Sequence, residues 1–148
     1  MNEVRKIPKI TEGRRASRII FVQYIFSQLF HNEDLDSIID ILKIENEDLK
    51  YNDKFLRALK DTFTEKIDES ESLIEMFVTR DLDNLKYSII IAAVTEFSLN
   101  DHALVISEYL KISDIFEIKP GFINGVLDNI SKKFKKGPDS TNIKKIQN

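Results

Sequence analysis

The stretch Lys119–Phe134, KPGFINGVLDNISKKF, decides which fold the rest of the chain is expected to adopt. Pro120 suits the first turn of a helix, because its φ is fixed near the helical value and it has no N–H to leave unbonded. The apolar residues that follow recur at helical spacing: Phe122, Ile123, Val126, Leu127, Ile130 and Phe134. The stretch therefore predicts an amphipathic helix with one continuous apolar arc facing a core.

Gly125 and Phe122 are the unusual residues of this predicted helix. A glycine inside a helix costs roughly 1 kcal/mol relative to alanine. Gly125 therefore indicates that another helix or a ligand approaches the backbone closely. Phe122 lies beside it at the edge of the apolar arc, where it is either a stacking platform for a ligand or a cap on the core. This stretch alone leaves both interpretations open.

Composition favours an all-α fold for the whole chain. The 148 residues fit one domain or two small, intimately packed units, and they include only 4 glycines and 3 prolines. That scarcity disfavours a turn-rich β sandwich and favours helices. There is no cysteine, no apolar run near the roughly 18 residues of a membrane span, and no signal core at the N-terminus. We expect a cytoplasmic protein without a membrane segment.

Hydrophobic periodicity predicts six or seven helices joined by short loops. The expected N-caps are Thr11, Asp34, Asn52 or Asp53, and Asp83. A helix break is expected near Ser70–Ser72. The predicted organisation is a flexible basic arm over residues 1–10, a helical domain over 11–136 and a disordered tail over 137–148.

Charge is distributed very unevenly along the chain. Residues 1–18 carry six basic and two acidic side chains, residues 33–114 carry nine basic and twenty acidic ones, and residues 115–148 carry seven basic and three acidic ones. If the two basic ends meet in space, they form the kind of patch that binds a polyanion. The alternative is that both ends are solvated tails.

Three arginines stand at the start of the predicted first helix. Arg14 and Arg18 share a face, Arg15 lies about a quarter-turn away, and all three project along the line of the apolar stripe that follows. Their guanidinium groups are expected either to hold phosphates and stack on bases, or to pair with carboxylates of the acidic middle. Glu96 falls on the tightly packed side of the apolar helix LDNLKYSIIIAAVTEFSL, so it needs a buried partner, and we expect an arginine from the first helix.

Motifs for catalysis are missing from the sequence. His31 and His102 each fall in a polar segment between helices, without a second ligand at metal-binding spacing. There is no GxxxxGK[ST], GxGxxG or GxSxG motif. We expect a protein that is not an enzyme and that takes no cofactor and no metal.

Three segments, in order, resemble the NusB family of bacterial transcription antitermination factors. GFINGVLDNI (residues 121–130) is similar to the family's C-terminal motif FVNGVLD. RRASRIIFVQYIF (residues 14–26) is similar to its arginine-rich first helix. LKYSIIIAAVTEF followed by VISEYLKIS resembles its buried helix and the next helix, with Glu96 and Glu108 at the family's glutamate positions.

The chain also departs from the family pattern. Ile19 replaces a glutamate that usually follows the arginines, Ser107 replaces an Asn or Asp, and apolar residues replace an arginine in the buried helix. The proline before the fifth helix is missing, and the segment from Glu108 to Phe122 looks short. The resemblance is therefore to a divergent member, and it covers roughly residues 14–134.

The resemblance implies two packed three-helix bundles and a role in transcription antitermination. It implies binding of boxA-type single-stranded RNA together with NusE, a small-subunit ribosomal protein, in an RNA polymerase complex that promotes rRNA operon transcription. Arg14, Arg15 and Arg18 would hold phosphates and Phe122 would stack on a base. Asn124 would bond a base edge or a phosphate, or would instead brace the helix start, since it points well away from Phe122.

Other functions stay open at this stage. A helical protein–protein adaptor without specific RNA binding has no need of the basic ends. A NusB-like domain of an RNA methyltransferase is disfavoured, because the sequence has no Gly-rich cofactor loop and no room for a catalytic domain. A homodimer is also open, since some family members self-associate.

Overall fold

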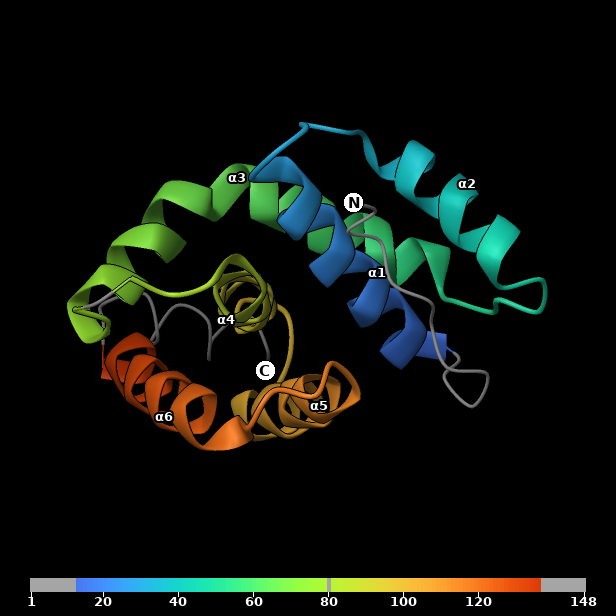
Figure 1. Cartoon of the computed structure of the whole chain (residues 1–148). Helices are drawn as coiled ribbons and strands as arrows, with labels where there is room; N and C mark the ends of the chain where they lie inside the picture. Colours follow the sequence, from blue (N-terminus) through green and yellow to red (C-terminus); the bar gives the residue numbers. More distant parts are fainter. Residues whose placement is uncertain (1–12, 80, 137–148) are drawn as a thin grey trace, which may run out of the picture.

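Helix α4 (Asn84–Glu96) lies at the centre of the molecule. The ten consecutive residues 88–97 are all buried, which explains a sequence that is apolar on almost every side. Figure 1 looks nearly along the axis of α4 and shows α3 above it, α5 and α6 below it, and α1 beside it. Each of these four helices packs against α4, so one helix organises the core.

The computed structural model describes residues 13–79 and 81–136. Within these ranges the chain forms six helices and no strand: α1 (Gly13–Gln28), α2 (Leu35–Glu45), α3 (Asp53–Phe77), α4, α5 (His102–Ile115) and α6 (Pro120–Lys136). The predicted all-α class is confirmed. The basic arm, the C-terminal tail and the cap at Thr11 were predicted for residues outside these ranges. No helix in the described ranges has the length and apolarity needed to cross a bilayer.

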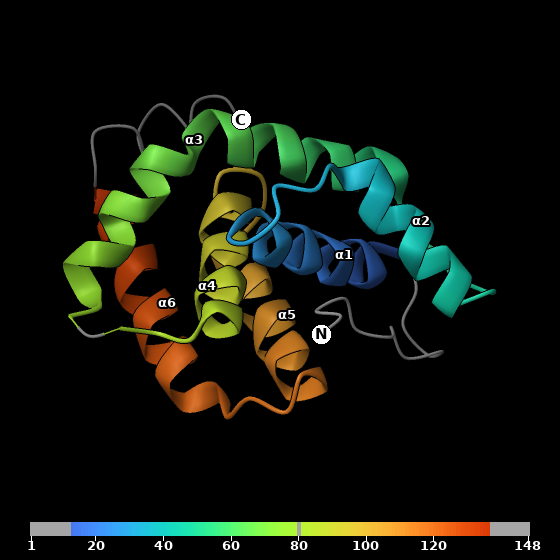
Figure 2. The ribbon, with the colours of Figure 1, turned by 45° about the horizontal axis from the view of Figure 1, so that its top comes forward.

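The six helices form two groups of three in chain order. In the first group α1 packs on both α2 and α3, and the Arg57–Asp36 ion pair ties α2 to α3; in the second group α4, α5 and α6 pack together. Helix α3 extends beyond its own group along α4 to reach α6, as Figure 2 shows. The predicted pair of three-helix bundles is therefore confirmed, and the two bundles share one continuous core.

Capping residues begin the helices where the sequence predicted them. The carboxylates of Asp34 and Asp83 accept hydrogen bonds from the third residue of α2 and α4, at 2.8 and 2.9 Å. Of the two candidates for α3, Asn52 is the cap, and its Oδ1 accepts from the backbone N–H of Phe55 at 2.9 Å. Asp101 caps α5 in the same way. These bonds satisfy N–H groups that a helix start leaves without a partner.

The predicted helix break near Ser70–Ser72 is wrong. Helix α3 runs without interruption from Asp53 to Phe77. Ser70 is only 4% exposed and Ile74 only 2%, so this part of the helix is pressed against its neighbours. Packing of a buried face outweighs the modest helix propensity of serine.

The first turn of α1 is anchored to the segment that leads into α3. Gly13 has a φ of +62°, in the left-handed region that favours glycine, and its N–H donates to the carbonyl of Lys50 at 3.0 Å. Ser17 Oγ accepts from the Asn52 N–H at 2.8 Å, and it lies 2.8 Å from the Asn52 carbonyl. The arginines at positions 14, 15 and 18 therefore stand on a helix start that is held in place.

Helix α6 begins at Pro120, as predicted, but Gly125 does not serve a close helix contact. A Cβ atom added at Gly125 meets no other atom within 4 Å, and the residue is exposed. The expectation that a neighbouring helix approaches there is wrong for the described part of the chain. The expectation that a ligand approaches stays a prediction.

Candidate nucleic-acid interface

Arg18 does not lie on the surface. Its side chain is 4% exposed, and its Nε and one terminal nitrogen donate to the two carboxylate oxygens of Glu96, both at 2.8 Å. An arginine of the first helix is thus the partner of Glu96, as the sequence suggested. A guanidinium this buried and doubly paired has no open edge for a phosphate, so the phosphate contact predicted for Arg18 does not fit the structure.

Glu96 is fully buried and fully bonded. Besides Arg18, its carboxylate accepts from the Tyr109 hydroxyl at 3.1 Å and from the Asn100 side-chain amide at 2.8 Å. Burial and the charge of Glu96 raise the pKa of Tyr109 well above its ordinary value, so this hydroxyl stays a donor. Burial alone would lower the pKa of Arg18, but the hydrogen bond and charge of Glu96 outweigh it and raise that pKa. The group is a satisfied buried network that joins α1, α4 and α5.

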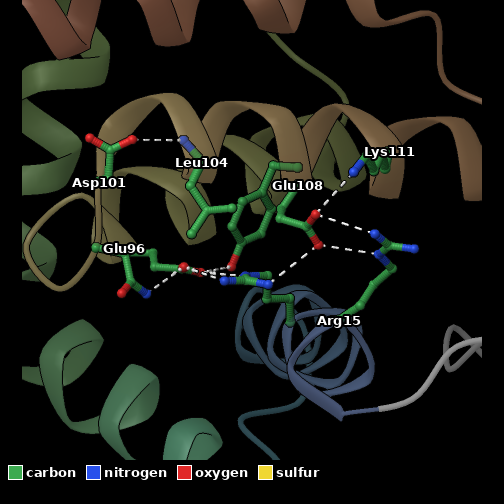
Figure 3. A network of polar contacts seen from close by, with 9 residues as sticks. Arg15, Glu96, Asp101, Leu104, Glu108 and Lys111 are labelled. Carbon is green, nitrogen blue, oxygen red and sulfur yellow. Dashed lines mark hydrogen bonds and ion pairs between the residues drawn. The ribbon is translucent and has the colours of Figure 1, made fainter.

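Glu108 carries this network out to the surface. Its Oε1 accepts from Arg15 Nε at 3.2 Å and from Arg18 at 3.4 Å, and its Oε2 accepts from Arg15 and from Lys111 Nζ, both at 3.2 Å. Burial would raise the pKa of Glu108, but the bonds from Arg15 and Lys111 and the nearby arginine charges outweigh it and lower that pKa. In Figure 3, Glu108 lies between Arg15 and Lys111, and Glu96 lies at the other end of the network.

Within the described residues, Arg14 is held by an aromatic ring and not by a carboxylate. Its guanidinium lies 4.7 Å from the centre of the Phe55 ring, and that of Arg18 lies 5.0 Å from the same ring. Contacts of this kind are favourable cation–π interactions. The three arginines therefore take three environments: Arg14 is exposed on Phe55, Arg15 is 39% exposed on Glu108, and Arg18 is buried.

Phe122 and Asn124 lie near the start of α6, on different sides of the helix. Phe122 is half-buried and packs against the core, so it has both the contact expected of a core cap and an exposed part that can stack on a base. Asn124 is exposed, and within the described ranges its side chain makes no hydrogen bond. The alternative that Asn124 braces the helix start therefore has no support.

Lys111 and Phe55 also belong to this site, although the sequence did not single them out. Glu108 and Lys111 are three residues apart on a helix, a spacing that favours an ion pair between them. This spacing is the signal that would have indicated Lys111. The apolar spacing of α3 indicates only that Phe55 belongs to the core. No local pattern indicates that an arginine from another helix lies on its ring.

The sequence predicted that His102 falls in a polar segment between helices, but the structure places it in the core. It is buried at the start of α5, where its ring stacks on Phe97 at 4.2 Å and meets Phe134 edge-on at 5.0 Å. Its Nε2 lies 3.1 Å from the carbonyl of Phe97, which only accepts, so this nitrogen carries a proton. Its Nδ1 lies 2.8 Å from Ser131 Oγ. No group of three or more metal-ligating side chains occurs in the part of the chain that the structure describes.

The chain was compared with known proteins. The family model described as the NusB family matches residues 15–132, which is well over half of the 148 residues. The matched range runs from within the first turn of α1 to most of α6 and so includes Arg15, Arg18, Glu96, Glu108 and Phe122. No curated protein matches the sequence.

Proposed function

The chain belongs to the NusB family, and from this premise we propose that it binds boxA-type single-stranded RNA together with NusE. This family is one of RNA-binding regulatory proteins of transcription antitermination. The finer proposal is that the chain acts in the cytoplasm as part of an RNA polymerase antitermination complex that promotes rRNA operon transcription.

The observation that carries this proposal is the pair Arg14 and Arg15 at the anchored start of α1. Arg14 is exposed on the face of Phe55, and Arg15 keeps a 39% exposed side chain while Glu108 fixes its guanidinium. Cations that are held in place lose little conformational entropy when they bind a phosphate. We assign phosphate contacts to Arg14 and Arg15. We assign a supporting role to Arg18, which ties α1 to Glu96 of α4.

Base recognition is assigned to the start of α6. Single-stranded RNA is read mainly by stacking of unpaired bases on aromatic rings and by hydrogen bonds to their edges. The exposed part of Phe122 supports the first role, and the unbonded side chain of Asn124 supports the second.

The protein partner is assigned to the acidic part of the chain. Exposed carboxylates follow one another along α3: Asp61, Glu65, Asp68, Glu69 and Glu75. Such a surface complements a basic ribosomal protein and repels RNA, which would keep the two partners on separate surfaces.

The test is binding of a boxA-type single-stranded RNA and of a scrambled RNA across a series of salt concentrations. We expect the boxA-type RNA to bind more tightly, and its affinity to fall as salt rises, because phosphate contacts release counterions. Arg14→Ala and Arg15→Ala should each weaken binding by about fivefold at 0.1 M salt, from a slope reduced by about 0.7 per contact. Phe122→Ala should reduce the preference for the boxA-type sequence.

Arg57 provides a matched control. Its side chain is also 39% exposed and paired with carboxylates, at 2.6 Å from Asp36 and 3.3 Å from Asp53, but it bridges α2 and α3. Arg57→Ala should leave RNA affinity nearly unchanged. If wild type binds no RNA with sequence preference, alone or with NusE added, the proposal is wrong and the adaptor function takes its place.

A further inference from the structure

Lys111 of α5 and Arg15 of α1 meet on one carboxylate. Lys111 Nζ and Arg15 Nη2 each lie 3.2 Å from Oε2 of Glu108, so the two nitrogens are no further apart than twice that distance. Figure 3 shows both side chains next to Glu108, at the opposite end of the network from Glu96. Two cations from different helices are thereby brought to one place.

The charges at this place do not cancel. Glu96 is matched by Arg18, which gives it two bonds of 2.8 Å, and this leaves Glu108 to balance both Arg15 and Lys111. Among the described residues of this network, one positive charge therefore remains in excess. Both cations are open to solvent, since the side chain of Lys111 is 54% exposed. A cation pair in excess of its carboxylate attracts a further anion.

Both side chains can bind that anion without leaving Glu108. A guanidinium has five N–H donors, and Arg15 uses two of them on Glu108. An ammonium group has three donors, and Lys111 uses one on Glu108 within the described residues. The remaining donors suffice for two oxygens of a single phosphate group.

We propose that Lys111 is a further RNA-phosphate contact, which grips the same phosphate as Arg15, and that Glu108 is the positioning residue that sets the two cations side by side. The proposal rests on the RNA-binding function proposed above. It extends the RNA surface from α1 onto α5. Glu108 itself does not touch the RNA; it acts through the two side chains that it holds.

The test compares Lys111→Ala and Lys111→Arg with wild type, using a boxA-type single-stranded RNA at salt concentrations between 0.05 and 0.5 M, about the range over which counterion release is measurable. Loss of one phosphate contact should reduce the slope of log affinity against log salt by about 0.7, which is about fivefold in affinity at 0.1 M salt. Lys111→Arg should restore both quantities. Stability should barely change, because Lys111 is 54% exposed and Glu108 keeps its bonds from Arg15 and Arg18.

Lys132 is the matched control for the loss of one charge. It is 67% exposed and pairs with Asp128 on its own helix at 3.0 Å. Its neighbour Ser131 bonds His102, which lies nine residues from Lys111 along α5, or about 13 Å at 1.5 Å per residue. Lys132→Ala should leave the slope unchanged. If Lys111→Ala and Lys132→Ala behave alike while Arg14→Ala weakens binding, this inference is overturned and the RNA-binding function stands.

Glu108→Gln tests the positioning role. Without the carboxylate, Arg15 and Lys111 are no longer held together, and their charges become available to any RNA. We expect the affinity for scrambled RNA to rise and the preference for the boxA-type RNA to fall, by about fivefold for one unmasked charge at 0.1 M salt. A purely structural role would change stability and leave this preference unchanged, which would overturn the assignment. If wild type binds no RNA at all, both this inference and the proposed function fail.

Discussion

Arg18 spans from α1 to α4 and binds Glu96 through two hydrogen bonds of 2.8 Å, with both side chains almost completely shielded from water. Its neighbour Arg15, three residues earlier, binds a carboxylate at 3.2 Å with much of its side chain in water. The two arginines come from one short motif, and burial separates their roles.

Replacing Arg18 should therefore unfold the protein more readily, whereas replacing Arg15 should not. Arg18→Ala leaves Glu96 buried without its counter-charge and should lower the free energy of unfolding by about 3–5 kcal/mol. Arg15→Ala removes a partly exposed guanidinium while Glu108 keeps its bonds from Arg18 and Lys111, so it should change the free energy of unfolding by no more than about 1 kcal/mol. Urea unfolding followed by circular dichroism measures both. An Arg18→Ala protein that is as stable as wild type would contradict the buried network.

The Tyr109 hydroxyl should contribute to stability through Glu96. Tyr109→Phe removes a hydrogen bond of 3.1 Å to a buried carboxylate and should cost about 1.5–3 kcal/mol. Tyr51→Phe is the matched control, because the Tyr51 hydroxyl lies 3.4 Å from Asp53 in an exposed position. The control should be nearly neutral, and equal effects of the two substitutions would show that the buried hydroxyl has no special role.

The contribution of Glu108 to stability should depend on pH in a defined direction. Its pKa in the folded protein is below the ordinary value of 4.5, because bonds from Arg15 and Lys111 and the arginine charges outweigh burial. Folding therefore favours the ionised form, and this contribution is complete above about pH 4.5 and is lost as the pH falls through the folded pKa.

The measurement is urea unfolding of wild type and Glu108→Gln from pH 7 to pH 3. The difference in free energy of unfolding between the two proteins should be constant down to about pH 4.5 and should then shrink, because protonated Glu108 resembles glutamine. A difference that stays constant to pH 3 would rule out a lowered pKa.

Gly125→Ala should make the protein more stable. The added Cβ meets no atom within 4 Å, and alanine is favoured over glycine inside a helix by about 0.5–1 kcal/mol. The same variant also tests whether Gly125 has a role in RNA binding. If RNA affinity falls in the more stable protein, a ligand approaches this face of α6; if affinity is unchanged, the glycine has no binding role.

Local sequence patterns predicted the helices well, because caps and hydrophobic spacing are local features. Asp34, Asp83 and Pro120 begin their helices as expected. The error within α3 has the opposite origin: Ser70 is held in the helix by neighbours that are distant in sequence. A propensity argument contains no information about such neighbours.

The candidate site was predictable from the sequence only in part, because nothing in the sequence analysis singled out Lys111 or Phe55. The sequence indicated the arginines of the first helix and a buried partner for Glu96. Arg14 and Arg18 share a face in any regular helix, so spacing alone does not tell which one the next helix covers. The place of His102 in the core follows from the way α4, α5 and α6 meet, and no pattern around His102 indicates it.

The burial of residues 88–97, in α4 and its C-cap Phe97, has a consequence for how the chain can be divided. A cut between α3 and α4 leaves one fragment in which the sides of α1 and α3 that face α4 are uncovered. In the other fragment, the apolar side of α4 that faces α1 and α3 is uncovered. Each fragment would present to water the surface that the other requires. Two such fragments produced together should associate and restore the complete fold, which makes this fold suited to reconstitution from halves.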